Sequence, residues 1–124
     1  MFKNRIEIIG SLGQNAAFTI TKSKKQLTKF SVAVNKTWKD KDGNPQKSTD
    51  WFPVVAWGNV ANFAKQLKKG DLVILEGELR TGEYTKDEVK HRTYEITART
   101  VVKLAKLESP GADEENPVPE ETAA

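Results

Sequence analysis

The sequence predicts a mostly-β domain with a single short helix. Apolar and polar residues alternate in several stretches of the chain, and this period of two is typical of strands with one face in a core. One stretch in mid-chain changes to an apolar spacing of three and four residues, which is typical of an amphipathic helix. Because only one helix is expected, the pattern excludes repeated strand–helix–strand units.

The strands expected before the helix are separated by turn residues. A Gly-Ser-Leu-Gly segment at residues 10–13 ends the first strand, and a lysine-rich turn at residues 22–25 follows the second extended piece. Asp-Gly-Asn-Pro at residues 42–45 then predicts a long hairpin with a basic tip. The expected extended segments are residues 5–9, the neighbourhood of Phe18 and Ile20, residues 30–35 and the strand that begins at Trp51.

The helix is expected over residues 59–69, where one apolar stripe ends at a Lys-Lys-Gly sequence. Two further strands follow, with a polar loop at residues 82–91 between them and the last strand at residues 93–104. Without the short extended piece around Phe18 and Ile20, the pattern has three strands, one helix and two strands. This is the element order of an OB fold, whose helix closes one end of a five-stranded barrel. We therefore predict an all-β protein with one short helix, built as a five-stranded OB-fold barrel with extended basic hairpins.

The charge of the chain is divided between a basic body and an acidic tail. All 20 Lys and Arg residues lie between Lys3 and Lys106, whereas six of the 17 acids lie in residues 108–124. The other 11 acids leave residues 1–107 with a net charge of +9, and the tail has −6, in agreement with the total of +3. We predict one OB-fold domain over residues 1–107, whose charge attracts polyanions, and a short disordered acidic tail over residues 108–124.

Composition limits the location of the protein. No apolar run approaches the roughly 18 residues that cross a bilayer. The chain has no cysteine, so it has neither a disulfide framework nor a thiolate metal site. We expect a cytoplasmic protein without membrane contact.

Catalytic side chains are scarce. The one histidine, His91, falls in the polar loop without a cysteine or a second imidazole nearby, and is interpreted as a surface residue. Glu76 and Glu78 share a strand face and could hold Mg²⁺ as in a small nuclease, although paired acids on an exposed strand face are common. We expect no enzyme, no catalytic residue, no metal and no cofactor, with the metal-dependent nuclease as the more distant alternative.

Aromatic residues interleaved with lysines indicate nucleic-acid binding. Three tryptophans fall within twenty residues, and rings beside cations suit a single strand, because each base can stack and each linker carries a phosphate. Trp51 and Trp57 share one strand face, while the apolar residues at the even positions between them share the other. This second set can supply the core, so we expect the tryptophans on the surface; core filling is the other interpretation.

Several segments occur together in an order that indicates one family. They are residues 4–6, 9–14, 30–34, 50–58, 68–70 and 76–81. Through them the chain resembles a bacterial-type single-stranded DNA-binding protein over residues 4–104. The resemblance implies an OB fold, usually a homotetramer with a dimer as the alternative, that binds single-stranded DNA with little sequence preference. Such proteins act in DNA replication, recombination and repair in the bacterial cytoplasm, at the nucleoid.

The resemblance also implies a set of site residues. The base-stacking positions of the family match Trp38, Trp51 and Trp57, and Tyr84 matches a fourth aromatic. The phosphate partners are expected beside these rings or on the same strands and loops. They are Arg5, Lys36, Lys39, Lys41, Lys69, Arg80, Lys90 and Arg92.

Three positions depart from the family pattern. The usual acidic tip closes with hydrophobic residues, typically Pro-Phe, and docks on replication and repair proteins, but here the end is Pro-Glu-Glu-Thr-Ala-Ala. Such proteins are candidate partners, although the tail lacks the tip on which the usual docking depends. Phe52 replaces a frequent histidine at a position associated with subunit contact. Pro53 cannot donate to a strand ladder, so it predicts a sheet edge or a bulge.

A second function is compatible with the same residues. Stacking rings do not distinguish DNA from RNA, because contact with the 2′-hydroxyl decides that choice. The nearer alternative is therefore an OB-fold protein that binds RNA, or one that serves as an interaction module in a replication complex. A comparison of single-stranded DNA with single-stranded RNA of equal length separates the first of these from DNA binding.

Overall fold

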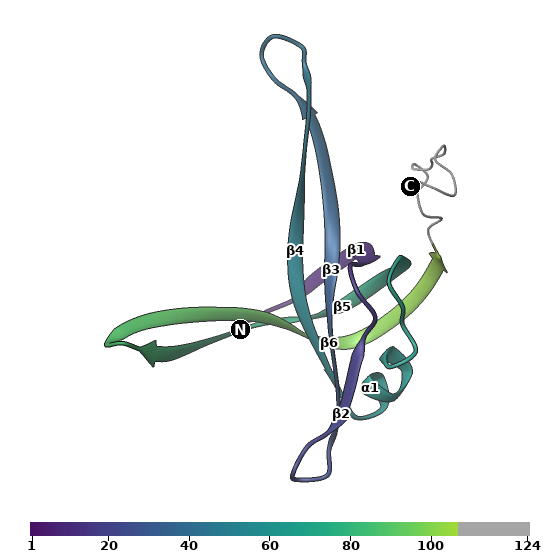
Figure 1. Ribbon diagram of the computed structural model, residues 1–124, viewed down its shortest axis with the longest axis vertical. Coiled ribbons are helices and arrows are strands. Elements are labelled where there is room, and N and C mark those ends of the chain that lie inside the picture. Colours follow the sequence, from purple (N-terminus) through teal and green to yellow (C-terminus); the bar gives the residue numbers. More distant parts are fainter. Residues whose placement is uncertain (107–124) are drawn as a thin grey trace.

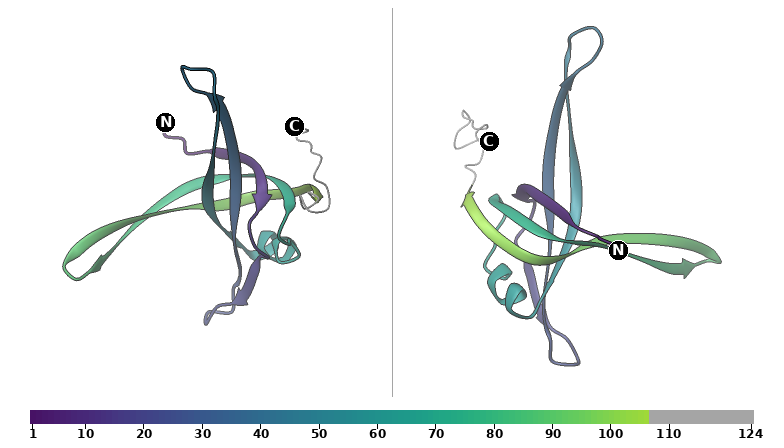
Figure 2. Two further views of the ribbon diagram at one scale, coloured as in Figure 1. Left: turned by 45° about the horizontal axis from the view of Figure 1, so that its top comes forward. Right: turned by 180° about the vertical axis from the view of Figure 1, so that it is seen from behind.

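Six strands and one helix make up the described part of the computed structural model, residues 1–106 (Figure 1). In chain order the elements are β1 (Ile6–Leu12), β2 (Ala17–Ile20), β3 (Gln26–Lys39), β4 (Pro45–Trp57), α1 (Gly58–Ala64), β5 (Asp71–Lys86) and β6 (Val89–Lys106). Two long hairpins, β3–β4 and β5–β6, extend away from the centre in different directions (Figures 1 and 2). The predicted disordered tail at residues 108–124 lies outside the described residues.

The strands close into a barrel. Their order is β1-β5-β6-β4-β3-β2, and an additional pairing of β1 with β3 completes the wall. β1 and β2 pair with successive parts of β3, so together they fill one position in the wall. β4 and β6 run parallel at Val54↔Ile96 and Val55↔Thr97, and the other pairs run antiparallel. The prediction of a five-stranded OB-type barrel with one short helix is confirmed.

Alternating side chains from the strands fill the barrel. Val32, Val73 and Ile96 have no exposed surface, and full burial of an aliphatic side chain contributes about 1.5–3 kcal/mol. α1 packs against β3, β4 and β6, and its fully buried Ala61 accepts a hydrogen bond of 2.7 Å from the hydroxyl of Thr28 on β3. The core therefore leaves the outer faces of β3 and β4 available for other contacts.

β1 is longer than the sequence predicts. The strand continues through Gly10 to Leu12, so the predicted stop at residues 10–13 is wrong. A Cβ atom on Gly10 would lie 2.3 Å from the carbonyl oxygen of Ala33 on β3. This glycine permits a close approach of two strands rather than a turn.

α1 is shorter than predicted, because it ends at Ala64 whereas the apolar stripe predicts residues 59–69. After the helix the amides bond three residues back, with Gln66 donating to the carbonyl of Phe63 at 3.2 Å and Leu67 to that of Ala64 at 3.0 Å. The tighter turn still buries Leu67, so the apolar stripe reaches the core without further helix. No helix within residues 1–106 is long and apolar enough to cross a bilayer.

Pro53 lies at a free edge of β4. The strand pairs with β3 through Ser31↔Pro53, but its ladder with β6 is limited to the next two residues, Val54 and Val55. Pro53 therefore lies just before the residues of β4 that pair with β6, and it has no partner on that side within residues 1–106. The predicted edge position is confirmed, and the residue tolerates the missing N–H donor there.

The largest difference from the sequence prediction concerns residues 82–91, where a polar loop was expected. β5 continues to Lys86 and β6 begins at Val89, so the hairpin turns through Asp87 and Glu88 alone. Both turn residues have positive φ, 54° and 65°, as a two-residue hairpin turn requires. Both faces of the hairpin are exposed, so no hydrophobic alternation reveals its strands.

Each long hairpin continues beyond the core as an arm. We call residues 35–49 the β3–β4 arm and residues 80–95 the β5–β6 arm. Their strands stay paired to the turns, and the two arms point in different directions from the barrel (Figures 1 and 2).

Candidate nucleic-acid interface

The four predicted stacking rings lie on the surface. The exposed fraction is 50% for Trp38, 57% for Trp51, 44% for Trp57 and 51% for Tyr84. A ring that filled the core would be covered on all sides, so the interpretation of the tryptophans as core residues is wrong. Each ring presents enough surface for a planar partner to stack.

Trp51 and Trp57 belong to the outer face of β4. The residues that alternate with them, Val54 and Ala56, are buried in the barrel. Alternation also places Val55 on the outer face with the tryptophans, yet only 5% of it is exposed, and it lines a groove on that face. The even-numbered residues supply the core as predicted, and the two rings stand outside it.

This groove lies on the same outer face as Trp51 and Trp57. It holds about 350 Å³, and its lining includes Lys29 and Ser31 of β3 together with Pro53 and Val55 of β4. The strand register places Lys29 opposite Val55 and Ser31 opposite Pro53. Positions opposite each other in an antiparallel pair share a face, so the groove runs along the ribbon between Trp51 and Trp57. Gln14 and Asn15 of the β1–β2 segment complete one side.

Trp51 is seated against the backbone of Gly13. A Cβ atom on Gly13 would lie 2.4 Å from Cζ3 and 2.8 Å from Cη2 of the indole. The amide of Gly13 donates to the carbonyl of Ser31 at 3.3 Å, which ties this backbone to β3. Only glycine leaves room for the ring in this orientation, so Trp51 is held by the barrel wall with one part facing solvent.

Trp38 lies on the β3–β4 arm and belongs to the other face of the ribbon. The register pairs Trp38 with Gln46 and Ala33 with Trp51 without a bulge, so Trp38 shares its side with Lys36, not with Trp51. The sequence prediction treated the three tryptophans as one set of stacking residues, because the pairing of β3 with β4 was not known. The structure therefore places Trp38 beyond the barrel, on a separate surface from the groove.

Asp40 fixes the tip of the β3–β4 arm. Its Oδ1 accepts hydrogen bonds from the amides of Asp42 at 2.9 Å and Asn44 at 2.8 Å, and its Oδ2 accepts one from the side chain of Gln46 at 3.3 Å. Gly43 has φ of 82°, a conformation that favours glycine. The aspartate thus builds a defined turn that presents the exposed Lys39 and Lys41.

Tyr84 lies on the β5–β6 arm and stacks on His91. The two residues are directly opposite each other on β5 and β6, with ring centroids 4.9 Å apart and planes inclined by 17°. The interpretation of His91 as a loop residue is wrong, because it lies in a strand and forms half of a two-ring pair. The pairing of β5 with β6 makes Tyr84 and His91 neighbours. A prediction of a loop at residues 82–91 contains no such pairing, so the sequence did not reveal this contact.

The eight predicted phosphate partners are all exposed but differ in their contacts. Within residues 1–106, five of them have no ion-pair partner: Lys39, Lys41, Lys69, Lys90 and Arg92. The amide of Lys69 donates to the side chain of Asn15 at 2.9 Å, which places Lys69 beside the groove. Lys90 and Arg92 flank His91, so alternation puts both on the opposite face of the arm from Tyr84.

The other three predicted cations already face carboxylates. Lys36 pairs with Asp50 at 3.0 Å, Arg5 pairs with Glu76, and Arg80 lies 3.7 Å from Glu78. An exposed pair such as Lys36–Asp50 contributes only about 0–1 kcal/mol, so a phosphate can replace this carboxylate at little cost. Glu76 and Glu78 are less exposed than Asp50.

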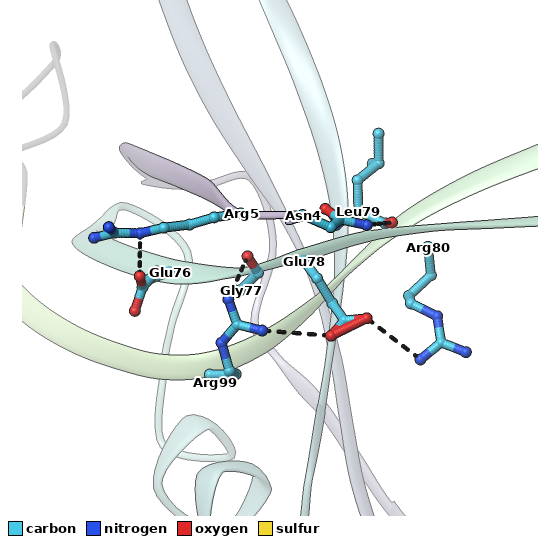
Figure 3. A network of polar contacts seen from close by, with 8 residues as sticks. All are labelled: Asn4, Arg5, Glu76, Gly77, Glu78, Leu79, Arg80 and Arg99. Atoms are coloured by element: carbon cyan, nitrogen blue, oxygen red, sulfur yellow. Dashed lines mark hydrogen bonds and ion pairs between the residues drawn. The ribbon is translucent and has the colours of Figure 1, made fainter. Parts of the chain in front are cut away.

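Glu76 and Glu78 belong to a network that joins β5 to its neighbours (Figure 3). Arg99 of β6 contacts Glu78 at 3.4 Å and donates to the carbonyl of Gly77 at 3.2 Å. Asn4 brackets Leu79: its amide donates to the Leu79 carbonyl at 2.8 Å and accepts from the Leu79 amide at 3.0 Å. Both carboxylates of the nuclease alternative thus face arginines. No group of three potential metal ligands occurs within residues 1–106.

Two cations near the rings were missed by the sequence reasoning. Lys29 lines the groove with Ser31, and Lys25 lies in a second cavity beside Trp57. The pairing of β3 with β4 brings Lys29 to the tryptophan face, and Lys25 lies in the turn just before β3. Sequence spacing alone does not give that register.

One family model matches most of the chain. The model is described as "Single-strand binding protein family" and covers residues 3–104. Two curated relatives are the "Single-stranded DNA-binding protein 1" of Chlorobaculum tepidum, 33% identical over 111 residues, and the "Single-stranded DNA-binding protein" of Neisseria meningitidis, 33% identical over 106 residues. These alignments cover 87% and 84% of this chain, and 68% and 61% of the relatives.

A solved structure has the same fold. The chain is similar to the one described as "Plasmodium falciparum SSB complex with ssDNA", with a TM-score of 0.77 and 25% sequence identity. The match covers 84% of this chain and 96% of that one. The likeness therefore extends over the barrel and not over one motif alone.

Proposed function

This chain belongs to the single-strand binding protein family, and we infer that it binds single-stranded DNA and catalyses no reaction. The observation that carries this function is the half exposure of four aromatic rings on the barrel and arms of a basic domain. In that role the protein covers single strands during DNA replication, recombination and repair. It works in the cytoplasm, at the nucleoid, where such strands arise.

Bases stack on the exposed rings. Trp51 and Trp57 are six residues apart on one strand, a span of about 20 Å at 3.3 Å per residue, and the groove lies between them. This is long enough for several nucleotides of one strand. Every base has a face to stack, and each stacked base contributes about 1–3 kcal/mol with little sequence preference.

Backbone phosphates contact the surrounding cations. Lys69 and Lys29 lie at the groove, while Lys39, Lys41, Lys90 and Arg92 extend the positive surface onto the arms. Arg5, Lys36 and Arg80 join after exchange of their carboxylates for phosphate. Affinity falls as salt rises, with a log–log slope of about −0.7 for each phosphate that is neutralised.

The protein assembles as a homotetramer, with a dimer as the alternative. Support comes from an apolar row across the outer face of β1, β5 and β6, where Ile9 pairs with Ile74 and Ile74 with Val102. Ile9 and Val102 are each 53% exposed, and Leu104 lies nearby on β6 with half its surface exposed. A contiguous apolar surface of this kind marks an association site. Phe52, by contrast, packs partly buried against the core.

The partners of this protein are DNA and other copies of the chain. Replication and repair proteins are further proposed partners.

Fluorescence anisotropy with labelled oligonucleotides tests the proposed function. We expect the chain to bind a 30-nucleotide dT strand, to bind a duplex of the same length far more weakly, and to lose affinity between two salt concentrations. Stronger binding to rU than to dT of equal length would favour the RNA alternative. Equal binding to duplex and single strand would contradict the stacking mechanism.

A further inference from the structure

A second cavity lies beside Trp57, at the end of the tryptophan face. It holds about 480 Å³ and is lined by Trp57 together with Thr21, Ser23 and Lys25 of the turn between β2 and β3. None of these three turn residues belongs to the stacking or phosphate sites described above. The cavity therefore combines an indole, two hydroxyls and an amine at one place on the surface.

Hydrogen bonds set the shape of this turn. The amide of Thr21 donates to the carbonyl of Lys25 at 2.9 Å, and the amide of Lys24 donates to the carbonyl of Thr21 at 2.8 Å. The hydroxyl of Thr21 accepts the amide of Lys25 at 3.1 Å and lies 3.1 Å from the hydroxyl of Ser23. Lys24 takes the left-handed conformation, with φ of 65°. The cavity wall is thus preformed before any ligand arrives.

The cavity continues the line of the groove. Trp57 pairs with Leu27, and two residues further along the same face Val55 pairs with Lys29 of the groove. Trp57 therefore separates the groove on one side from the turn cavity on the other. A strand that follows the outer face of β4 past Trp57 meets Lys25 next.

We propose that Lys25, with the hydroxyls of Thr21 and Ser23, forms a phosphate subsite that holds the nucleotide stacked on Trp57. This proposal rests on the proposed function and extends its DNA path onto the β2–β3 turn. The amine and whichever of the two hydroxyls accepts in the Thr21–Ser23 hydrogen bond donate to phosphate oxygens, while the indole takes the base. Within residues 1–106 Lys25 has no ion-pair partner that competes for the phosphate.

A matched pair of lysine substitutions tests the subsite. Lys25→Ala removes the lining amine, whereas Lys22→Ala removes an equal charge from the same turn without touching the cavity. Anisotropy titrations with dT strands over a series of salt concentrations give the log–log slope for each variant. We expect Lys25→Ala to make the slope less steep by about 0.7, the value for one phosphate, and Lys22→Ala to leave it unchanged. Equal slopes for the two variants would overturn the subsite.

A double substitution tests whether lysine and indole hold the same nucleotide. If they do, Lys25→Ala reduces affinity by a smaller factor in a Trp57→Ala background than in the wild-type protein. The same factor in both backgrounds would overturn the shared subsite. Failure of the wild-type protein to bind dT would instead reject the proposed function, so the two failures are distinguishable.

Discussion

The barrel and its two arms place aromatic rings in different ways. On the barrel wall, Trp51 rests against the backbone of Gly13 and Trp57 ends a strand whose other face is in the core. On the arms, Trp38 and Tyr84 stand on two-stranded ribbons exposed on both faces, held by strand pairing, turn hydrogen bonds and one neighbouring ring. From this difference we infer that contacts with the wall orient its rings before DNA arrives. We expect the arm rings to lose more conformational freedom on binding.

The largest expected effect is on assembly, which should depend on a surface of the barrel and not on the β5–β6 arm. Val102→Asp places a charge in the apolar row on the barrel, where association would bury it at a cost of several kcal/mol. We expect sedimentation or light scattering to show a smaller assembly than for the wild-type protein. Val89→Asp is the matched control, because Val89 is equally exposed, at 54%, but lies at the tip of the β5–β6 arm. An unchanged mass for Val102→Asp would contradict assembly through this row.

The next effect compares a wall ring with an arm ring. Trp51→Ala is expected to weaken dT binding by about 1–3 kcal/mol, roughly 5- to 150-fold, because it removes a preoriented stacking surface. Tyr84→Ala should cost less. Phe63→Ala serves as a control, because Phe63 is an exposed ring on α1 outside the groove. A greater loss for Tyr84→Ala than for Trp51→Ala, measured by anisotropy, would reverse the proposed order.

Gly13→Ala tests the cause of the difference directly. The new Cβ would lie 2.4 Å from the indole of Trp51, so we expect the ring to move from its position against Gly13. We expect several-fold weaker dT binding, approaching the effect of Trp51→Ala, with a thermal melt that still shows a folded protein. In a Trp51→Ala background Gly13→Ala should have almost no further effect. Wild-type affinity for Gly13→Ala alone would show that the wall does not orient this ring.

The smallest effect concerns the pair on the β5–β6 arm. His91→Ala removes the ring that stacks on Tyr84, and a cross-strand aromatic pair contributes about 0.2–1 kcal/mol. We expect a small loss of dT affinity, with His91→Phe restoring most of it because it keeps a stacking ring. If His91→Phe binds as weakly as His91→Ala, the stack does not support Tyr84.

The same contrast explains how much of the molecule the sequence predicts. Along the barrel, alternation of residues such as Val54 and Ala56 with Trp51 and Trp57 predicted the core and the exposed rings, because burial imposes a pattern. On the β5–β6 arm both faces are in solvent, so apolar and polar residues do not alternate there. The strands of this arm were therefore not predicted. Gly10 was interpreted as part of a turn, because glycine is favoured both in turns and where two strands approach closely, and the sequence does not distinguish the two cases.

The candidate site shows the same division. Ring identity was visible in the sequence, but contacts between distant strands were not. The pairing of Arg5 with Glu76, the stack of His91 on Tyr84 and the approach of Lys25 to Trp57 each depend on how strands align. Spacing along one strand predicts which face of the sheet a side chain occupies. Which residues of other strands lie beside it is known only once the strand pairing is known.

Intrinsic tryptophan fluorescence during titration with oligo-dT tests the central claim most directly, because the proposed stacking residues are themselves the reporters. Stacking of bases on the exposed indoles predicts strong quenching by the single strand, little quenching by duplex DNA, and a smaller change in Trp51→Ala. Tight binding of dT that leaves the fluorescence unchanged would contradict the account, because the strand would then be held away from the tryptophan face.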